Sequence, residues 1–171
     1  MKGSGWRQAA AAAAAGVLLS GCGVAARPAA APSRAKAVVI KVGRALVAGR
    51  EETVLTNDAG HTLYYFTLDQ PQRSACTGSC QQIWPALRAV SPTEPVQIPS
   101  GVPGRFKIVA DGNGEQVTYN GHPLYTYSLD LAPGQAHGEG LFHEWFVAVP
   151  GLKAAVPAGP PAGGAGGGSG Y

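Results

Sequence analysis

Short runs of apolar and β-branched residues follow one another along the middle of this chain, and turn residues separate them. In the first half such runs occupy residues 38–42, 45–47 and 53–56, and a further run at 62–67 follows a turn at 57–60. Side chains alternate between the two faces of a strand, so runs of this length bounded by Asn, Asp and Gly predict strands joined by turns.

The second half shows the same pattern more clearly. Runs at 106–109 and 116–119 flank a turn at 111–114, and Asn120-Gly121 separates the second run from another at 124–127. Asn-Gly between two such runs is a strong hairpin signal, because both residues tolerate positive φ. A closing strand is predicted at 145–149. Helical periodicity is nearly absent, so the pattern predicts an all-β fold.

The two halves also contain the same motif. Residues 60–69 align with residues 121–130 at six identical positions of ten, and the same offset of 61 places Trp84 on Trp145. A constant offset over this length indicates two copies of one structural unit.

We therefore expect a single all-β domain at 35–152, in which two related β-meander or hairpin repeats pack on one core. Repeat 1 spans about 45–90 and repeat 2 about 105–150. Residues 91–104 hold four prolines and two glycines and are expected to link the repeats. A sandwich, a barrel and two packed meanders all fit this pattern.

The N-terminus has the features of an export signal. Lys2 and Arg7 precede an apolar run at 9–19, which is too short to cross a hydrocarbon core of about 30 Å as a helix. Leu19-Ser20-Gly21-Cys22 follows and resembles a bacterial lipobox, in which the cysteine receives a lipid. We expect a lipoprotein signal peptide at 1–21. An ordinary signal peptide with an incidental cysteine is the alternative.

These features predict where the mature protein resides. Acylated Cys22 would hold it in the cell membrane, at the extracytoplasmic face. Residues 22–34, rich in Ala, Pro and Arg, are expected to form a flexible tether, and residues 153–171, mostly Gly, Ala and Pro, a disordered tail.

The charge of the chain bears on one class of partner. The chain has 13 basic and 10 acidic residues, and removal of the signal peptide with Lys2 and Arg7 leaves 11 basic residues. No basic cluster remains, which argues against nucleic acid as a partner.

The repeated motif resembles a known family. Residues 64–69 and 125–130 both fit the pattern Tyr-x-(Phe/Trp/Tyr)-x-x-Asp. Together with the lipobox and the segment from Cys76 to Trp84-Pro85, the chain resembles predicted bacterial lipoproteins described as secreted repeats of unknown function. The resemblance covers about residues 45–150. It implies a surface lipoprotein with a repeat-built domain, and it implies no reaction.

Cys76 and Cys80 are the first candidates for chemistry. Outside the cytoplasm a Cys-x-x-x-Cys pair beside Gly78 is expected to close a small disulfide ring. The alternatives are a redox-active dithiol, or thiolate ligands for copper or a haem-related group. The second repeat has His137 and Leu141 at these positions, so the pair belongs to one repeat only.

Asp69 and Asp130 end the two motifs. We expect each carboxylate to accept hydrogen bonds from backbone N–H groups of the following turn. A cation site, or a pair of acids in a pseudo-symmetric site, is the alternative.

Aromatic residues recur at equivalent positions in the two motifs. In Tyr-x-aromatic both rings lie on one face of a strand, so core packing is expected. An exposed surface that stacks on a glycan, haem or quinone is the alternative. The residues concerned are Tyr64, Phe66, Trp84, Tyr125, Tyr127 and Trp145.

The four histidines do not have the spacing of a metal site. His61 and His122 are equivalent residues beside turn glycines, where we expect them to be exposed, and His137 and His143 occur in the second repeat only. Sequence motifs of common hydrolases, phosphate-binding loops and haem attachment are absent.

The sequence thus favours a non-enzymatic binding or interaction module without a cofactor, with an envelope protein or a small molecule as partner. An extracytoplasmic redox or metal-handling protein, using copper or haem at Cys76 and Cys80, is the alternative.

Overall fold

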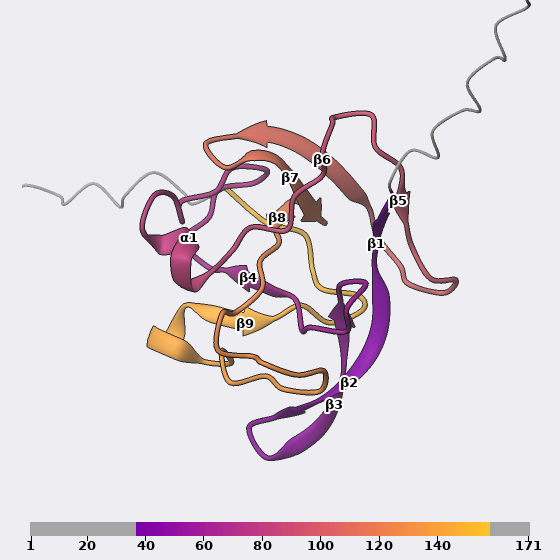
Figure 1. Cartoon of the computed structure of the whole chain (residues 1–171), viewed down its shortest axis with the longest axis vertical. Helices are drawn as coiled ribbons and strands as arrows, with labels where there is room; N and C mark the ends of the chain where they lie inside the picture. Colours follow the sequence, from indigo (N-terminus) through magenta and orange to yellow (C-terminus); the bar gives the residue numbers. More distant parts are fainter. Residues whose placement is uncertain (1–36, 158–171) are drawn as a thin grey trace, which may run out of the picture. The chain divides into compact units, whose positions relative to one another are not determined.

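The computed structural model describes residues 37–157. The predicted signal peptide, Cys22 and the tether lie outside the described residues, as do residues 158–171 of the predicted tail. Within 37–157 the chain forms nine strands, one α-helical turn and one 3-10 turn, which confirms the predicted all-β fold (Figure 1). No helix in this part of the chain is long and apolar enough to cross a membrane.

The first repeat begins with an antiparallel hairpin. β2 and β3 pair from Lys41 opposite Thr56 to Val47 opposite Arg50. Alternation along the end of β2 buries Ala45 and Val47. The strands of the first repeat are β1 (Val38–Val39), β2 (Lys41–Val47), β3 (Arg50–Thr56) and β4 (Tyr64–Phe66).

The second repeat contains the equivalent hairpin, formed by β6 and β7 around the predicted turn. Its strands are β6 (Phe106–Asp111), β7 (Gly114–Tyr119), β8 (His122–Pro123) and β9 (Trp145–Val147). The prediction of a strand over residues 124–127 is wrong, because β8 ends at Pro123 and Tyr125 forms only isolated bridges. Thr126 N donates to Pro85 O at 2.9 Å, but Pro85 has no N–H group to return the hydrogen bond, so a regular ladder does not continue here.

The segment between the repeats is more than a linker. It contains β5 (Val96–Gln97), which pairs in parallel with β1. Val38 N donates to Pro95 O at 3.0 Å, and Ile40 N donates to Gln97 O at 2.9 Å. The prolines that flank β5 limit it to two residues, as expected for an edge strand.

The loops before the two tryptophans each contain a short helical turn. α1 (Cys80–Ile83) precedes Trp84, and η1 (Leu141–His143) precedes Trp145. These turns occupy equivalent positions in the two repeats.

Both repeats contribute to each hydrophobic cluster of the domain. One cluster contains Tyr64 and Trp84 together with Tyr125 and Trp145. The other contains Leu55 and Leu63 together with Val117 and Leu124. In Figure 1 the β2–β3 and β6–β7 hairpins lie toward opposite ends of the domain, with β4 and β9 between them. The repeats therefore form one folded body.

Candidate functional site

The two repeats exchange their motif segments. β4 of the first repeat pairs with β9 of the second, with Phe66 opposite Trp145. Thr67 N donates to Glu144 O at 2.8 Å, and the equivalent Ser128 N donates to Ile83 O at 2.9 Å. Each motif segment therefore pairs with the tryptophan segment of the other repeat.

A local two-fold relation passes between Tyr64 and Tyr125. Tyr64 N donates to Tyr125 O at 2.9 Å, and Tyr125 N donates to Tyr64 O at 3.0 Å. Their side chains then cross to the opposite repeat. Tyr64 OH donates to Asp130 Oδ2 at 2.5 Å, and Tyr125 OH donates to Asp69 Oδ2 at 2.9 Å. Each motif tyrosine thus binds the motif aspartate of the other copy.

Four aromatic rings form a continuous stack through this interface. Trp84 and Trp145 lie parallel at its centre, with ring centroids 3.8 Å apart and an interplanar angle of 1°. Phe66 stacks on Trp145 at 4.3 Å, and the equivalent Tyr127 stacks on Trp84 at 4.4 Å. Such pairs contribute about 0.5–1.5 kcal/mol each beyond burial of their area. The motif aromatics therefore hold the repeats together.

Each motif aspartate also fixes the loop that follows it. Ala75 N donates to Asp69 Oδ1 at 2.7 Å, and His137 N donates to Asp130 Oδ1 at 2.9 Å. Asp130 additionally lies 3.2 Å from His137 Nδ1, and its side chain is almost fully buried. Each carboxylate therefore accepts a hydrogen bond from one tyrosine hydroxyl and another from the backbone of its own loop.

Among residues 37–157, no basic side chain lies within ion-pair distance of Asp69. Burial raises the pKa of Asp69 to about 7, while hydrogen bonds from Ala75 N and the Tyr125 hydroxyl oppose the increase and the charge of Asp111 adds to it. Burial and the Asp69 charge likewise raise the pKa of Tyr125. Asp69 therefore titrates near neutral pH in the folded protein.

A buried polar network continues from Tyr125 beneath the cysteine loop. The hydroxyls of Tyr125 and Ser74 lie 2.5 Å apart. Asn113 Nδ2 donates to Ser74 Oγ at 2.8 Å, to Cys76 O at 3.0 Å and to Gln116 Oε1 at 3.0 Å. The predicted hairpin turn at 111–114 thus has a second role, because Asn113 connects it to the first repeat.

Cys76 and Cys80 form a disulfide with Cα atoms 5.4 Å apart, which confirms the predicted pairing. Neither sulfur is a free thiolate. Among residues 37–157, no group of three or more His, Cys, Asp or Glu side chains is placed to hold a metal ion. The metal-handling alternative thus gains no support from the geometry.

The four histidines differ in their burial and their contacts. His61 and His122 are half-buried and not exposed as predicted. The His122 ring packs on Tyr65 with ring centroids 4.8 Å apart, and its burial lowers its pKa. His137 and His143 are exposed. His137 contacts Asp130, as described above.

An apolar pocket of about 290 Å³ opens at one end of the aromatic stack. Trp84 and Tyr127 form one part of its wall, and Leu129 and Phe142 form another. Leu129 is 60% exposed and Phe142 is 77% exposed. The remaining lining residues are Ile83, Ser128 and Leu141.

The backbone of Phe142 has a strained conformation. Its φ is 55° and that of the next residue, His143, is 58°, a conformation that costs a non-glycine residue on the order of 1–3 kcal/mol. Burial of the phenyl ring does not offset this cost, since the ring is mostly in solvent. The strained backbone thus places an apolar ring at the mouth of the pocket.

The opposite end of the stack is chemically different. The repeat offset places Glu144 at the position of Ile83, disulfide-bonded Cys80 at that of Leu141, and Gln81 at that of Phe142. The apolar pocket therefore depends on residues in which the two copies diverge. We take it as the candidate site and call it the stack-end pocket.

Sequence reasoning identified two residues of this pocket, Trp84 and Tyr127, as core residues. It missed Ile83, Leu129 and Phe142, because isolated apolar residues in loops follow no strand alternation. Ile83 and Phe142 carry one signal, divergence, because the other repeat has Glu144 and Gln81 at their positions. Leu129 carries no such signal, since its equivalent is Leu68.

The fold and the exchanged motifs define an all-β domain built from an interlocked sequence repeat. The chain belongs to the family described as a secreted repeat of unknown function, whose model matches residues 45–88 and 107–149. This assignment confirms the resemblance seen in the motif and indicates an extracytoplasmic protein. No curated protein and no solved structure matches the chain.

Proposed function

We propose that this protein is a lipid-anchored extracytoplasmic binding module, which holds an apolar ring-bearing group in the stack-end pocket. The observation that carries the proposal is the pocket itself, an apolar hollow framed by a rigid aromatic stack and a strained Phe142. Binding sites for small ligands are mostly apolar and largely preformed, and this pocket has both properties.

The lining favours binding over catalysis. The only hydroxyl groups in the pocket belong to Tyr127 and Ser128, and no acid or base lines it to activate them. Asp69 and Asp130 are engaged by tyrosine hydroxyls and backbone amides in the repeat interface.

The volume sets the size of the occupant. A cavity of about 150 Å³ accommodates benzene in another protein, and pockets for drug-sized ligands begin near 300 Å³. A volume of about 290 Å³ therefore suits a fused two-ring group. A small molecule with such a ring, or an aromatic side chain of an envelope protein, would supply it.

Anchoring follows from the N-terminal sequence. Leu19-Ser20-Gly21-Cys22 after a short apolar run supports acylation at Cys22, and residues 22–34 would tether the domain to the membrane. Mass spectrometry of the protein from bacterial membranes tests this part. A diacylglyceryl adduct on Cys22 supports it, and an unmodified N-terminus contradicts it.

Binding is tested with indole, a neutral two-ring probe, added to ¹⁵N-labelled residues 22–171 carrying Cys22→Ser. Saturable amide shifts are expected around Leu129 and Phe142. Leu129→Asn should weaken binding roughly tenfold, because it removes apolar contact worth on the order of 1–2 kcal/mol.

Leu68→Asn is the matched control. Leu68 is the equivalent of Leu129 in the first repeat and is 55% exposed, but it does not line the stack-end pocket. Its substitution should leave the indole affinity unchanged. Absence of saturable shifts, or equal losses in the two variants, would refute the proposed site.

A further inference from the structure

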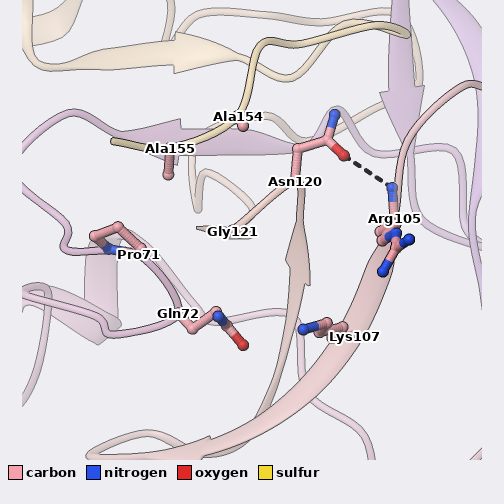
Figure 2. Close-up of a pocket in the computed structure, with 8 residues that line it drawn as sticks. All are labelled: Pro71, Gln72, Arg105, Lys107, Asn120, Gly121, Ala154 and Ala155. Atoms are coloured by element: carbon pink, nitrogen blue, oxygen red, sulfur yellow. Dashed lines mark hydrogen bonds between the residues drawn. The ribbon is translucent and has the colours of Figure 1, made fainter. Parts of the chain in front are cut away.

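A second pocket of about 280 Å³ lies at the Asn120–Gly121 turn, away from the aromatic stack (Figure 2). Arg105 and Lys107 supply its charge. These residues are two positions apart on and just before β6, so their side chains leave the same face of the strand. Figure 2 shows the Gln72 side chain reaching toward the Lys107 ammonium with its amide oxygen nearest.

Both cations lack a partner. In the part of the chain that the structure describes, neither the Arg105 guanidinium nor the Lys107 ammonium forms an ion pair or a side-chain hydrogen bond. Both side chains are exposed, and no carboxylate lines the pocket. The pocket therefore presents two uncompensated positive charges.

The first repeat provides an internal comparison. Leu63 N donates to Leu55 O as Leu124 N donates to Val117 O, so the residues that follow Leu55 and Val117 are equivalent. Thr56 pairs with Lys41, and Thr118 pairs with Lys107.

The two lysines thus hold the same position in the two hairpins, but their surroundings differ. Lys41 Nζ lies 2.8 Å from Asp58 Oδ1 in the turn of the first repeat. The turn of the second repeat, Asn120-Gly121, contains no acid. Lys107 therefore has no equivalent of the Asp58 carboxylate that neutralises Lys41.

The walls of the pocket are fixed before any ligand arrives. Arg105 N donates to Asn120 Oδ1 at 2.8 Å, and Asn120 Nδ2 donates to Leu152 O at 2.6 Å. Gln72 N donates to Gly121 O at 2.7 Å. A Cβ at Gly121, whose φ is 92°, would lie 3.3 Å from Ala155 Cβ, so glycine permits this close approach.

We propose that this pocket binds the phosphate group of a phosphate ester. Arginine offers a fork of N–H donors and lysine a compact charge, and both match the oxygens of a phosphate. The Gln72 amide adds a further polar group at the same opening. Pro71, Ala154 and Ala155 provide apolar wall for the organic part of the ester. A soluble phosphate ester and a phospholipid headgroup share this chemistry.

The test uses ¹⁵N-labelled residues 22–171 with Cys22→Ser. Glycerol 3-phosphate is titrated against the protein, and vesicles of phosphatidylglycerol are added to a second sample. Saturable shifts are expected at the amides of Gln72, Lys107 and Gly121. Lys107→Met and, separately, Arg105→Gln should each raise the Kd roughly tenfold or more.

Lys41→Met is the matched control, since it removes the equivalent lysine and should change the Kd less than about twofold. Saturable binding of glycerol 3-phosphate supports the site and identifies a soluble source. Binding to vesicles alone, lost in Lys107→Met, supports the site and identifies a lipid headgroup. No response to either probe, or equal losses in Lys107→Met and Lys41→Met, would overturn the proposal.

Discussion

Replacement of Asp69 by asparagine should remove a pH dependence of stability. Burial raises the pKa of Asp69 to about 7 in the folded protein, against an ordinary value of about 4 in the unfolded chain. Between these values the folded state holds a proton that the unfolded state has lost. The free energy of unfolding therefore falls as pH rises from about 4, and the loss is complete above about pH 7.

The magnitude follows from the displacement of the pKa. A tenfold change in proton affinity corresponds to about 1.4 kcal/mol, so a change from about 4 to about 7 corresponds to about 4 kcal/mol. Asp69 is not fully buried, and solvent screening reduces this to about 2–4 kcal/mol. Asparagine keeps an acceptor for Ala75 N and remains uncharged at every pH.

The assay is urea unfolding of both proteins between pH 4.5 and 8, with the disulfide intact. The difference in unfolding free energy should shift by about 2–4 kcal/mol in favour of Asp69→Asn as pH rises. The difference isolates Asp69, since Glu139, whose pKa burial also raises, is present in both proteins. Asp58→Asn, which removes an exposed carboxylate, controls for the loss of one negative charge. Parallel pH profiles for wild type and Asp69→Asn would refute the reasoning.

Three further predictions concern the frame of the domain. Tyr64→Phe should lower the unfolding free energy by about 1–3 kcal/mol in urea titrations, because the buried Asp130 loses the hydrogen bond from the Tyr64 hydroxyl. Tyr127→Phe should lower it by less than about 0.5 kcal/mol. Similar losses in the two variants would contradict the reciprocal network. The double variant Cys76→Ser, Cys80→Ser should lose about 2 kcal/mol of unfolding free energy in thermal unfolding, as expected for the short loop that the disulfide closes. It should still bind indole. Loss of indole binding in a folded double variant would contradict a purely structural disulfide. The parallel stack of Trp84 and Trp145 should produce an exciton couplet in circular dichroism that Trp145→Phe abolishes, and an unchanged spectrum would contradict the stack.

Local features of the sequence predicted the local features of the fold. The turn at 111–114 and the Asn120-Gly121 turn were predictable, because positive φ at Asn and Gly is a property of single residues. The disulfide was predictable from its short spacing and expected compartment. The linker strand β5 was not, since a two-residue strand between prolines has too little pattern to detect.

The exchange between the repeats depends on non-local pairing. An offset of 61 shows that Tyr64 and Tyr125 are equivalent, but it does not determine whether each tyrosine meets the aspartate of its own copy or of the other. The structure selects the second arrangement, and the motif spacing contains no signal for it. For the same reason Asp69 and Asp130 were predicted to bind turn amides, while their tyrosine partners were missed.

The two pockets were hidden for a different reason. Leu129 and Phe142 stand in loops, and Arg105 and Lys107 form no basic run, so neither periodicity nor composition marks them. Comparison of the two copies marks Phe142, which is Gln81 in the first repeat, and Lys107, whose equivalent Lys41 is neutralised by Asp58. It does not mark Leu129, which is leucine in both copies.

The most direct test of this account is to locate bound indole in residues 22–171 carrying Cys22→Ser by nuclear Overhauser effects. We expect contacts from the indole protons to the methyl groups of Leu129 and Leu141 and to the ring of Phe142. We expect none to Leu68, at the other end of the stack. Contacts at Leu68 equal to those at Leu129, or no saturable binding, would contradict the assignment of the stack-end pocket as the functional site.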